Sequence, residues 1–340
     1  MKLIHGINLG GYLSQCVHTQ EHYRTFICEE DLQIIAEMGY DHVRLPIDYN
    51  VLETDEGKVI ESGYAYVDQV IAWSHKYGLD IILDLHKAYG YDFNNAGDAE
   101  QNNLFSSEPL MQRFVDLWSR IAKRYAEYDF VAFELLNEVV EAENAQVWNN
   151  LIRRAVAAIR VWAPTAPIIY GGICWNSATT LKLLEKPTDP NIIFTFHFYE
   201  PLLFTHQKAY WVAAMDPNQT VYYPKSMEYF KTESQKLGYQ GGAVFDAKSL
   251  HMGQEFMEEV MQSAIDAASA AGVRLYCGEY GVIDQAPLED TLRWFTDVET
   301  IFHKFGIGRS VWTYKKMDFG LIDEHYTPIR EALLKLIRES

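Results

Sequence analysis

Apolar residues in this chain gather in short runs that recur along its whole length. Eight of these runs are rich in Val, Ile, Phe and Tyr. Short apolar runs of this kind are typical of strands that are buried on both faces of a parallel sheet. The predicted strands are residues 4–9, 42–46, 81–86, 130–136, 168–171, 192–199, 274–279 and 310–314.

The segments between these runs have helical periodicity. After the third run, apolar residues recur at steps of three and four, as on one face of a helix, at Phe114, Leu117, Trp118, Ile121 and Tyr125. Eight strand–helix units in a chain of 340 residues predict an α/β fold, the (β/α)8 or TIM barrel. A doubly wound sheet is the alternative, but its phosphate-binding motif G-x-G-x-x-G is missing.

One connection is much longer than the others. Residues 200–253 separate the sixth predicted strand from the next predicted helix, and roughly 50 residues exceed an ordinary loop. The segment includes LLFTHQKAYW, VYYP and GYQGGAVF, which is too aromatic for a disordered stretch. We therefore expect residues 1–340 to form a single barrel domain, with residues 200–253 inserted as a small subdomain on its C-terminal rim.

Charge and hydropathy narrow the range of partners. The formal net charge is −18 at pH 7, so nucleic acid and anionic membrane surfaces would be repelled. No apolar stretch approaches the roughly 18 residues that a membrane helix needs. The N-terminal sequence MKLIHGINLGGYL lacks the features of a signal peptide. We expect a cytoplasmic protein, or a secreted one whose leader is absent from this sequence.

Polar and aromatic residues stand at the ends of the predicted strands. In a (β/α)8 barrel these ends meet at one rim, where the active sites of the fold lie. Any single residue has a structural explanation, such as a buried ion pair for an arginine. Six different strands direct such groups to the same rim, which favours a shared site. The candidates are Arg44, His86, Asn137, Glu138, His197, Tyr199, Glu279 and Trp312.

Glu138 and Glu279 form the strongest pair among these candidates. They follow the fourth and seventh strands, which lie across the barrel mouth from each other. Two carboxyl groups in different environments can divide their roles, one protonated and one ionised. That arrangement cleaves glycosidic bonds. Arg44 would hold one of the two carboxylates ionised.

The other acids of the segment FELLNEVVE have different expected roles. Glu134 lies inside the strand, so we expect it to point into the barrel as a hydrogen-bonded structural group. Glu141 and Glu143 fall in the loop that follows, and we expect both to face solvent.

A metal site is the alternative chemistry. His86, His197, Glu138 and Glu279 are all acceptable ligands. Against this reading, the chain has no H-x-H after the first strand and no H-E-x-x-H. Its four cysteines form no C-x-x-C pair and have no zinc-type spacing. We predict that no metal and no cofactor is needed, and keep a metal-dependent barrel hydrolase as the alternative.

Seven segments of the chain resemble those of one enzyme family. GINLGGYLSQ, HVRLPIDYN, ILDLHKAYG, AFELLNEVVE, FTFHFYEPLLFTHQ, YCGEYGV and VWTYKKMDF are similar in order and spacing to family 5 of the glycoside hydrolases, in clan A. The resemblance covers essentially the whole chain. It is strongest to bacterial endoglucanases with a small subdomain between the sixth strand and the sixth helix. Val139 departs from the commonest family pattern, which has Pro after the acid/base glutamate.

The resemblance implies a role for each candidate. Glu138 in LLNE matches the acid/base and Glu279 in CGEYG matches the nucleophile. The other matching residues would contact the nucleophile (Arg44 and Tyr199), bind the sugar 2-hydroxyl (Asn137) and complete the wall of the subsite that holds the attacked sugar (His86, His197 and Trp312).

Residues and resemblance together predict a retaining glycosidase with its carboxyl groups about 5–5.5 Å apart. Endo action is implied by the resemblance alone. The expected substrate is β-1,4-glucan or mixed-linkage β-1,3-1,4-glucan, as polysaccharide or oligosaccharide. A β-mannanase or a β-1,3-glucanase on the same core is the alternative. A sugar-binding protein without activity fits less well, because both glutamates are present. Trp211, inside the insertion, is expected to shape the cleft where the glucan approaches.

Overall fold

The computed structural model describes residues 1–339, and its strands form one closed parallel barrel. Each strand pairs with the next along the chain, and β8 closes the barrel against β1. All eight predicted strands are present, so the predicted (β/α)8 barrel is confirmed. The strands are β1 (His5–Asn8), β2 (His42–Asp48), β3 (Asp80–Lys87), β4 (Val131–Glu134), β5 (Ile168–Gly171), β6 (Ile192–Phe198), β7 (Arg274–Tyr280) and β8 (Gly308–Val311).

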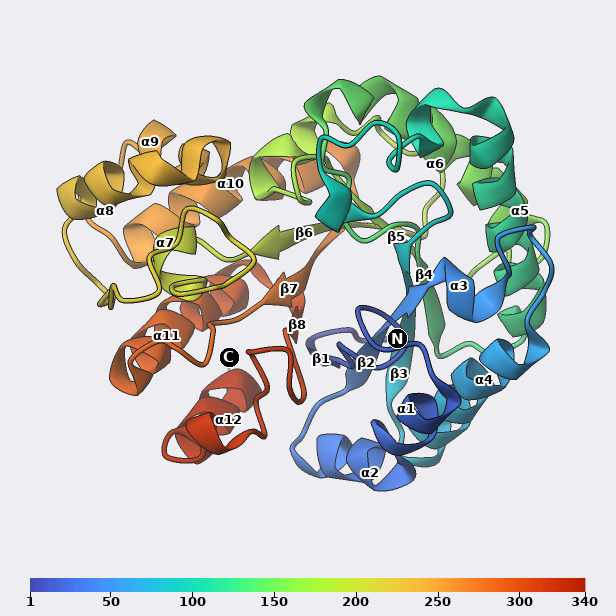
Figure 1. The fold of residues 1–340 in the computed structure, drawn as a ribbon, viewed down its shortest axis with the longest axis horizontal. Helices are drawn as coiled ribbons and strands as arrows, with labels where there is room; N and C mark the ends of the chain where they lie inside the picture. Colours follow the sequence, from blue (N-terminus) through green and yellow to red (C-terminus); the bar gives the residue numbers. More distant parts are fainter. Residues whose placement is uncertain (340) are drawn as a thin grey trace.

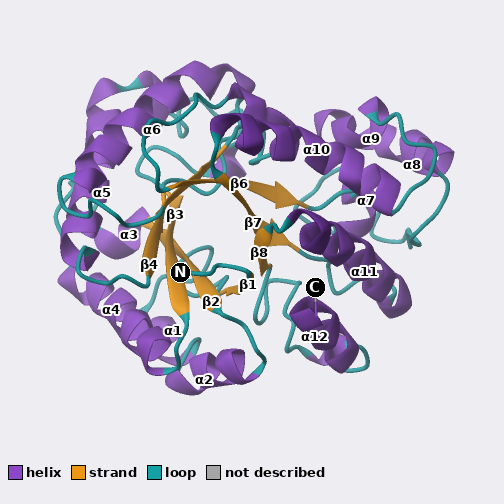
Figure 2. Cartoon of the chain, turned by 180° about the vertical axis from the view of Figure 1, so that it is seen from behind, coloured by secondary structure: helices purple, strands orange, loops and turns teal. Residues whose placement is uncertain are grey.

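Helices surround the strands on the outside (Figures 1 and 2). The α-helices are α1 (Gln20–Thr25), α2 (Glu29–Glu37), α3 (Tyr49–Leu52), α4 (Glu61–Lys76), α5 (Glu108–Tyr125), α6 (Ala145–Arg160), α7 (Leu202–Thr205), α8 (Met227–Glu233), α9 (Gly242–Asp246), α10 (Gln254–Ala271), α11 (Leu288–Phe305) and α12 (Arg330–Glu339). Short 3-10 helices are η1 (Phe93–Asn95), η2 (Leu104–Ser106), η3 (Ala142–Asn144), η4 (Ala178–Leu183), η5 (Ser234–Gly241) and η6 (Glu324–Tyr326). None of the helices in this described part is long and apolar enough to cross a membrane.

The fifth unit of the barrel is shorter than the pattern suggests. Only the six-residue η4 follows β5 before the chain enters β6, in place of a full α-helix. η4 packs against α10, which follows β6. The loop between β5 and η4 therefore lies beside the insertion that precedes α10.

The insertion itself consists of short helices. Between β6 and α10 the chain forms α7, α8, η5 and α9, and α8 and α9 lie at one side of the barrel, beyond α10 (Figure 1). Two X-Pro peptides, Glu200–Pro201 and Tyr223–Pro224, are cis in this segment. That residues 200–253 form a separate subdomain within one domain stays a prediction.

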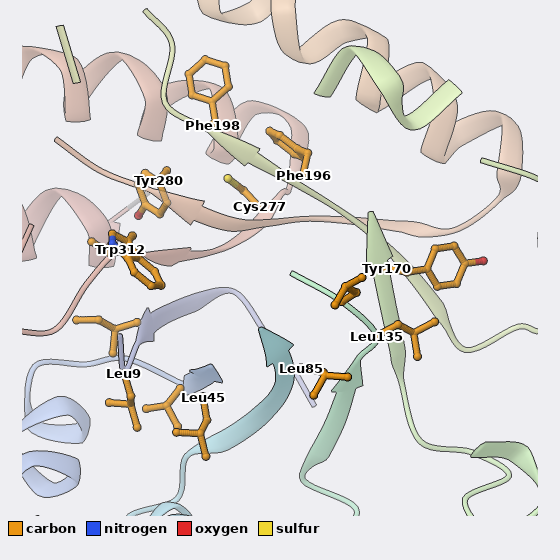
Figure 3. Close-up of a cluster of buried hydrophobic side chains, with 14 of the residues drawn as sticks. Leu9, Leu45, Leu85, Leu135, Tyr170, Phe196, Phe198, Cys277, Tyr280 and Trp312 are labelled. Atoms are coloured by element: carbon orange, nitrogen blue, oxygen red, sulfur yellow. The ribbon is translucent and has the colours of Figure 1, made fainter. Parts of the chain in front are cut away.

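The main core lies between the strands and the helices. Successive strand residues alternate between this layer and the barrel interior, as a pleated strand requires. On β3, Leu83 and Leu85 belong to the outer layer, while Ile82 and Asp84 are buried on the inner side. Figure 3 shows part of the outer layer, including Leu45 of β2, Leu85 of β3 and Phe196 of β6.

The barrel interior is divided into two levels. The lower level contains the apolar side chains of Ile82, Ala132, Ile169 and Ile193, together with Tyr276, whose hydroxyl is hydrogen-bonded to the buried His42 at 2.7 Å. The next inward positions along β2, β3 and β4 are polar, namely Arg44, Asp84 and Glu134, and all three side chains are fully buried. The polar groups thus begin inside the barrel and continue upward to its C-terminal rim.

Candidate active site

Arg44 is the centre of the polar network in the barrel. Its Nε and Nη2 donate to the two carboxylate oxygens of Glu134, at 2.8 Å each. Its Nη1 donates to Oε1 of Glu279 at 2.9 Å, and Nη2 lies 3.0 Å from Oδ2 of Asp84. A bidentate guanidinium–carboxylate pair is strongly directional. Arg44 lies inside β2 rather than at its end, and Glu134 is the buried structural group that the sequence predicted.

Glu279 reaches the rim because of an irregularity in β7. Phe196 pairs with Cys277, but His197 pairs with Glu279, so Gly278 is an extra residue in β7. An extra residue shifts the strand's alternation by one position, as in a β-bulge. Cys277 and Tyr280 both belong to the outer core, and Glu279 between them turns inward to Arg44. A Cβ on Gly278 would lie 3.1 Å from both His197 and Thr195, so glycine suits this position.

Glu279 receives a second donor on its other oxygen. The hydroxyl of Tyr199 donates to Oε2 at 3.0 Å, while Arg44 occupies Oε1. Burial raises the pKa of Tyr199 well above its usual value, so the phenol keeps its proton and remains a donor. The two donors together occupy both oxygens of the Glu279 carboxyl and fix its orientation. The contacts expected of Arg44 and Tyr199 are present in the structure.

Glu138 lies opposite in a different environment. Its side chain is 12% exposed, and Oε1 lies 2.7 Å from Nδ1 of His197, with no arginine or lysine in contact. Burial raises the pKa of Glu138 to about 7, an effect that His86 and Arg44 oppose from a distance. Burial also lowers the pKa of His197 to about 4, so this imidazole is neutral at neutral pH. Glu138 is therefore a carboxyl group that can hold a proton near pH 7.

The two glutamates are close together. One carboxylate oxygen of each and one ring nitrogen of His197 all lie within 4.8 Å of one another. Nδ1 of His197 is 3.6 Å from Oε2 of Glu279. Asn137 is next to Glu138, and its Oδ1 accepts a hydrogen bond from Nη2 of Arg44. Its buried Nδ2 has no partner among residues 1–339. A free amide donor in this place is able to bind a ligand oxygen.

His86 and Trp312 form a flat wall beside the carboxyl pair. Their rings stack at a centroid distance of 5.8 Å and an interplanar angle of 4°. Nδ1 of His86 is hydrogen-bonded to Asp84 at 2.6 Å, which fixes the ring. Burial lowers the pKa of His86 to about 4, so its ring is also neutral. Trp312 directly follows β8, which ends one residue before it.

All nine residues predicted for the site line or underlie one large cleft. The cleft has a volume of about 1360 Å³, and eight of the nine form its surface, with Arg44 beneath them. This volume exceeds the roughly 300–1,000 Å³ of pockets for drug-sized ligands. Trp211 lies on the insertion, 45% exposed, in contact with His206 and Phe319. The geometry is consistent with every assigned position, while the individual roles stay predictions.

The structure adds groups that the sequence pattern left unnoticed. Asn8 accepts from Arg44 at 2.9 Å, and Gln15 lies 3.2 Å from Nε2 of His86. Glu200, one residue after Tyr199, lines the cleft, and burial raises its pKa to about 7. Asp84 stands two positions before His86, on the same face of β3, and this spacing was a signal that could have identified it.

The expectation for Glu141 was wrong. Its side chain is half-buried, not solvent-facing, and it accepts from Asn144 at 3.3 Å and from Asn102 and Tyr91 at 3.4 Å. These bonds join the loop after β4 to the loop after β3, because the carboxylate sits between them. Glu143 is exposed, as expected.

Glu138, His197 and Glu279 also form the one group among residues 1–339 that could hold a metal ion. Two features of the surroundings disfavour a cation there. Both oxygens of Glu279 already accept hydrogen bonds, and one of the donors is the guanidinium of Arg44. The fixed positive charge of Arg44, 2.9 Å from Oε1 of Glu279, would repel a divalent ion bound to this carboxylate.

A closed parallel barrel with two carboxyl groups facing each other at the C-terminal rim defines the class of barrel glycoside hydrolases. Comparison with known proteins identifies the family within this class. The model of the cellulase family, glycosyl hydrolase family 5, matches residues 7–318, and the chain belongs to this family.

Named relatives cover nearly the whole chain. Endoglucanase C of Acetivibrio thermocellus is 41% identical over 98% of this chain and 97% of its own length. Cellodextrinase A of Ruminococcus flavefaciens is 38% identical over 92% of this chain and 86% of its own length. Among solved structures, Cel5A of Thermotoga maritima with mannotriose is 25% identical, with a TM-score of 0.75 over 99% of this chain and 97% of that one.

Proposed function

We propose that this protein is an endoglucanase that hydrolyses β-1,4-glucan or mixed-linkage β-1,3-1,4-glucan with retention of anomeric configuration. Membership of the cellulase family and the 41% identity to an endoglucanase support the substrate class. The observation that carries the mechanism is the unequal environment of two neighbouring carboxyl groups. Glu279 is bound by Arg44 and Tyr199, whereas Glu138 is buried without a cationic partner.

In the first step Glu279 attacks the anomeric carbon of the bound sugar. The bond from this carbon to the glycosidic oxygen breaks, and Glu138 gives its proton to that oxygen. A pKa of about 7 leaves about half of the Glu138 carboxyl groups protonated in neutral solution and most of them protonated in mildly acidic solution. Arg44 and Tyr199 each donate to one oxygen of Glu279 and orient it for the attack.

In the second step Glu138 acts as the base. Its carboxylate takes a proton from a water molecule, whose oxygen attacks the anomeric carbon and releases Glu279. Two displacements restore the original configuration. The unpaired amide of Asn137 is placed to donate to the sugar 2-hydroxyl, a contact that would strengthen as charge develops. Trp312, stacked on His86, offers an aromatic face to the sugar ring.

The separation of the carboxyl groups supports retention rather than inversion. Inverting enzymes keep them about 6.5–9.5 Å apart to admit a water molecule. Here two carboxylate oxygens lie within 4.8 Å. Proton NMR of the products from a cello-oligosaccharide should show the β-anomer first, before mutarotation. Initial formation of the α-anomer would refute the proposed mechanism.

A β-mannanase activity is the second candidate. The related Thermotoga maritima enzyme was crystallised both with cellobiose and with mannotriose. Assays of one purified sample on carboxymethylcellulose, barley mixed-linkage glucan, laminarin and mannan separate these alternatives, laminarin testing for β-1,3-glucanase activity. We expect the highest kcat/KM on the first two substrates. Lasting loss of activity after EDTA, restored by a divalent ion, would instead favour a metal-dependent mechanism.

A further inference from the structure

The backbone that carries Glu138 forms no strand and no helix. It is the chain between β4 and η3, residues 135–141, which we call the acid segment. Hydrogen bonds to other parts of the barrel must therefore fix its path. Just before Glu138, the N–H of Asn137 donates to the carbonyl of Leu85 in β3 at 3.1 Å. The position of the carboxyl then depends on how the segment is held just after Glu138.

Two hydrogen bonds hold the acid segment after Glu138. The carbonyl of Val139 accepts from the N–H of Trp175 at 3.2 Å. The N–H of Val140 donates to the hydroxyl oxygen of Tyr91 at 2.7 Å. Both valines are buried, so water is a poor substitute for either partner. The first bond joins two backbone groups, whereas the second is made by a side chain and can be removed by one substitution.

The backbone partner on the β5 loop is held by an unusual turn. Cys174, Trp175 and Asn176 have φ values of 57°, 56° and 54°, three consecutive non-glycine residues in the left-handed region. Such residues cost free energy and persist where the surroundings impose them. The carbonyl of Asn176 accepts from the backbone of His197 at 2.9 Å, which ties the turn to β6. The contact from Trp175 is therefore a fixed reference beside which the contact from Tyr91 can be altered.

The hydroxyl of Tyr91 is itself held in place. The backbone of Tyr91 exchanges two hydrogen bonds with Ala88, directly after β3, at 2.9 and 3.1 Å. The buried ring meets Phe105 edge-on, with centroids 5.2 Å apart. Burial raises the pKa of Tyr91 well above its usual value, so the hydroxyl keeps its proton. It donates to Oε2 of Glu141 at 3.4 Å, which leaves its lone pairs for the N–H of Val140.

Tyr91 lies behind the cleft and not on its surface. Glu138 lines the cleft, whereas Tyr91 does not. Tyr91 therefore reaches the reaction only through the backbone that carries the acid. An acid must hold its proton within about 2.6–3.2 Å of the oxygen that receives it, so a small shift of this backbone affects proton transfer.

We propose that Tyr91 is a positioning residue for the general acid, and that its bond to the Val140 backbone holds the Glu138 carboxyl at the glycosidic oxygen. This inference rests on the proposed endoglucanase function and deepens it. Without the hydroxyl, the buried N–H of Val140 has lost its partner, and the acid segment shifts to find another. Proton donation by Glu138 then slows, while the attack by Glu279, held from other strands, is preserved.

Two leaving groups separate this role from a general loss of structure. The sugar released from cellotetraose must be protonated as it leaves, whereas 2,4-dinitrophenolate leaves without a proton. We expect Tyr91→Phe to lower kcat/KM for cellotetraose about tenfold, and kcat/KM for 2,4-dinitrophenyl β-cellobioside by less than about twofold. With a series of aryl β-cellobiosides, the loss should grow as the phenol becomes a poorer leaving group. Glu138→Ala should show the same pattern with a larger loss.

Two further variants make the test decisive. Tyr89→Phe removes a hydroxyl from the same loop, where the ring packs on Arg113 away from the cleft, and should leave both rates unchanged. Glu141→Ala keeps Tyr91 but removes the acceptor of its proton, and should lower the ratio of kcat/KM for cellotetraose to that for the dinitrophenyl substrate, though by less than Tyr91→Phe. It carries the test if thermal unfolding shows that Tyr91→Phe does not fold.

The outcomes also separate this inference from the proposed function. An active unaltered protein whose ratio is unchanged in Tyr91→Phe, or in Glu141→Ala where Tyr91→Phe does not fold, overturns the positioning role alone. Equal losses on both substrates overturn it as well, because a purely structural defect does not depend on the leaving group. If the unaltered protein hydrolyses neither substrate, the endoglucanase function itself fails, and the inference with it.

Discussion

Replacing Glu138 by glutamine should stabilise the fold, and the gain should depend on pH. Burial raises the pKa of this carboxyl from 4.5 to about 7 in the folded protein. In the unfolded chain the same group is hydrated and has its ordinary value. Glutamine has nearly the same shape and is always neutral. The substitution therefore removes the cost of placing a charge in the site.

The direction of this pH dependence follows from proton binding in the folded and unfolded states. Between pH 4.5 and about 7 the folded state holds a proton on Glu138 that the unfolded state has lost. The contribution of Glu138 to the stability of the unaltered protein therefore falls as pH rises through this window. One pKa unit is worth about 1.36 kcal/mol, so the full shift corresponds to about 3 kcal/mol. His197, whose pKa is lowered to about 4 in the folded state, takes up a proton on unfolding in part of this window; its contribution has the opposite sign but is common to both proteins and cancels in their difference.

Urea unfolding followed by tryptophan fluorescence measures this difference. At pH 4 the free energies of unfolding of Glu138→Gln and the unaltered protein should be similar. At pH 8 the variant should be more stable by up to about 3 kcal/mol. Glu143→Gln, in the same loop but exposed, should show no such gain at either pH. If the difference in free energy of unfolding between Glu138→Gln and the unaltered protein is the same at both pH values, the reasoning is refuted. The substitution would then relieve something other than the desolvation of a charge.

The remaining predictions concern activity. Glu279→Ala should lower kcat by roughly 10⁴-fold or more, and azide should restore turnover as a glycosyl azide detectable by mass spectrometry; undiminished hydrolysis would remove Glu279 as nucleophile. Tyr199→Phe keeps the ring but removes the donor to Oε2 of Glu279, so kcat should fall about tenfold, and an unchanged rate would show that this bond is dispensable. Trp211→Ala removes a half-exposed ring from the cleft and should raise KM on long glucans several-fold; an unchanged KM counts against its predicted role.

Much of the fold and site could be predicted because the barrel imposes simple rules. Period-two alternation places Glu134 inside the barrel, and the rule that strand ends meet at one rim brings Glu138 near Glu279. The match of several motifs to one family supplied the roles. These inferences need only the order of residues within short segments, which a sequence displays directly.

Other features depend on contacts between distant segments. The bulge at Gly278 reverses the direction of Glu279, and simple alternation from Tyr276 would have pointed this carboxyl toward the helices. Glu141 was assigned to solvent because nothing nearby in sequence shows its partners on the β3 loop. The left-handed turn at Trp175 contains no glycine, so the sequence gives no local sign of it. Tertiary packing determines each of these conformations.

Closure of the barrel has a consequence for synthesis of the protein. Asn8, which orients Arg44, donates to the carbonyl of Gly278, and Thr313 donates to the carbonyl of Asn8 at 2.8 Å. The groups that support Arg44 and Glu279 thus come from the first and the last strands of the barrel and the residues that directly follow β8. A chain still being translated would carry most of its strands and yet lack these contacts. Enzymatic activity should therefore appear late, after the eighth strand has left the ribosome, and it would report directly on completed closure.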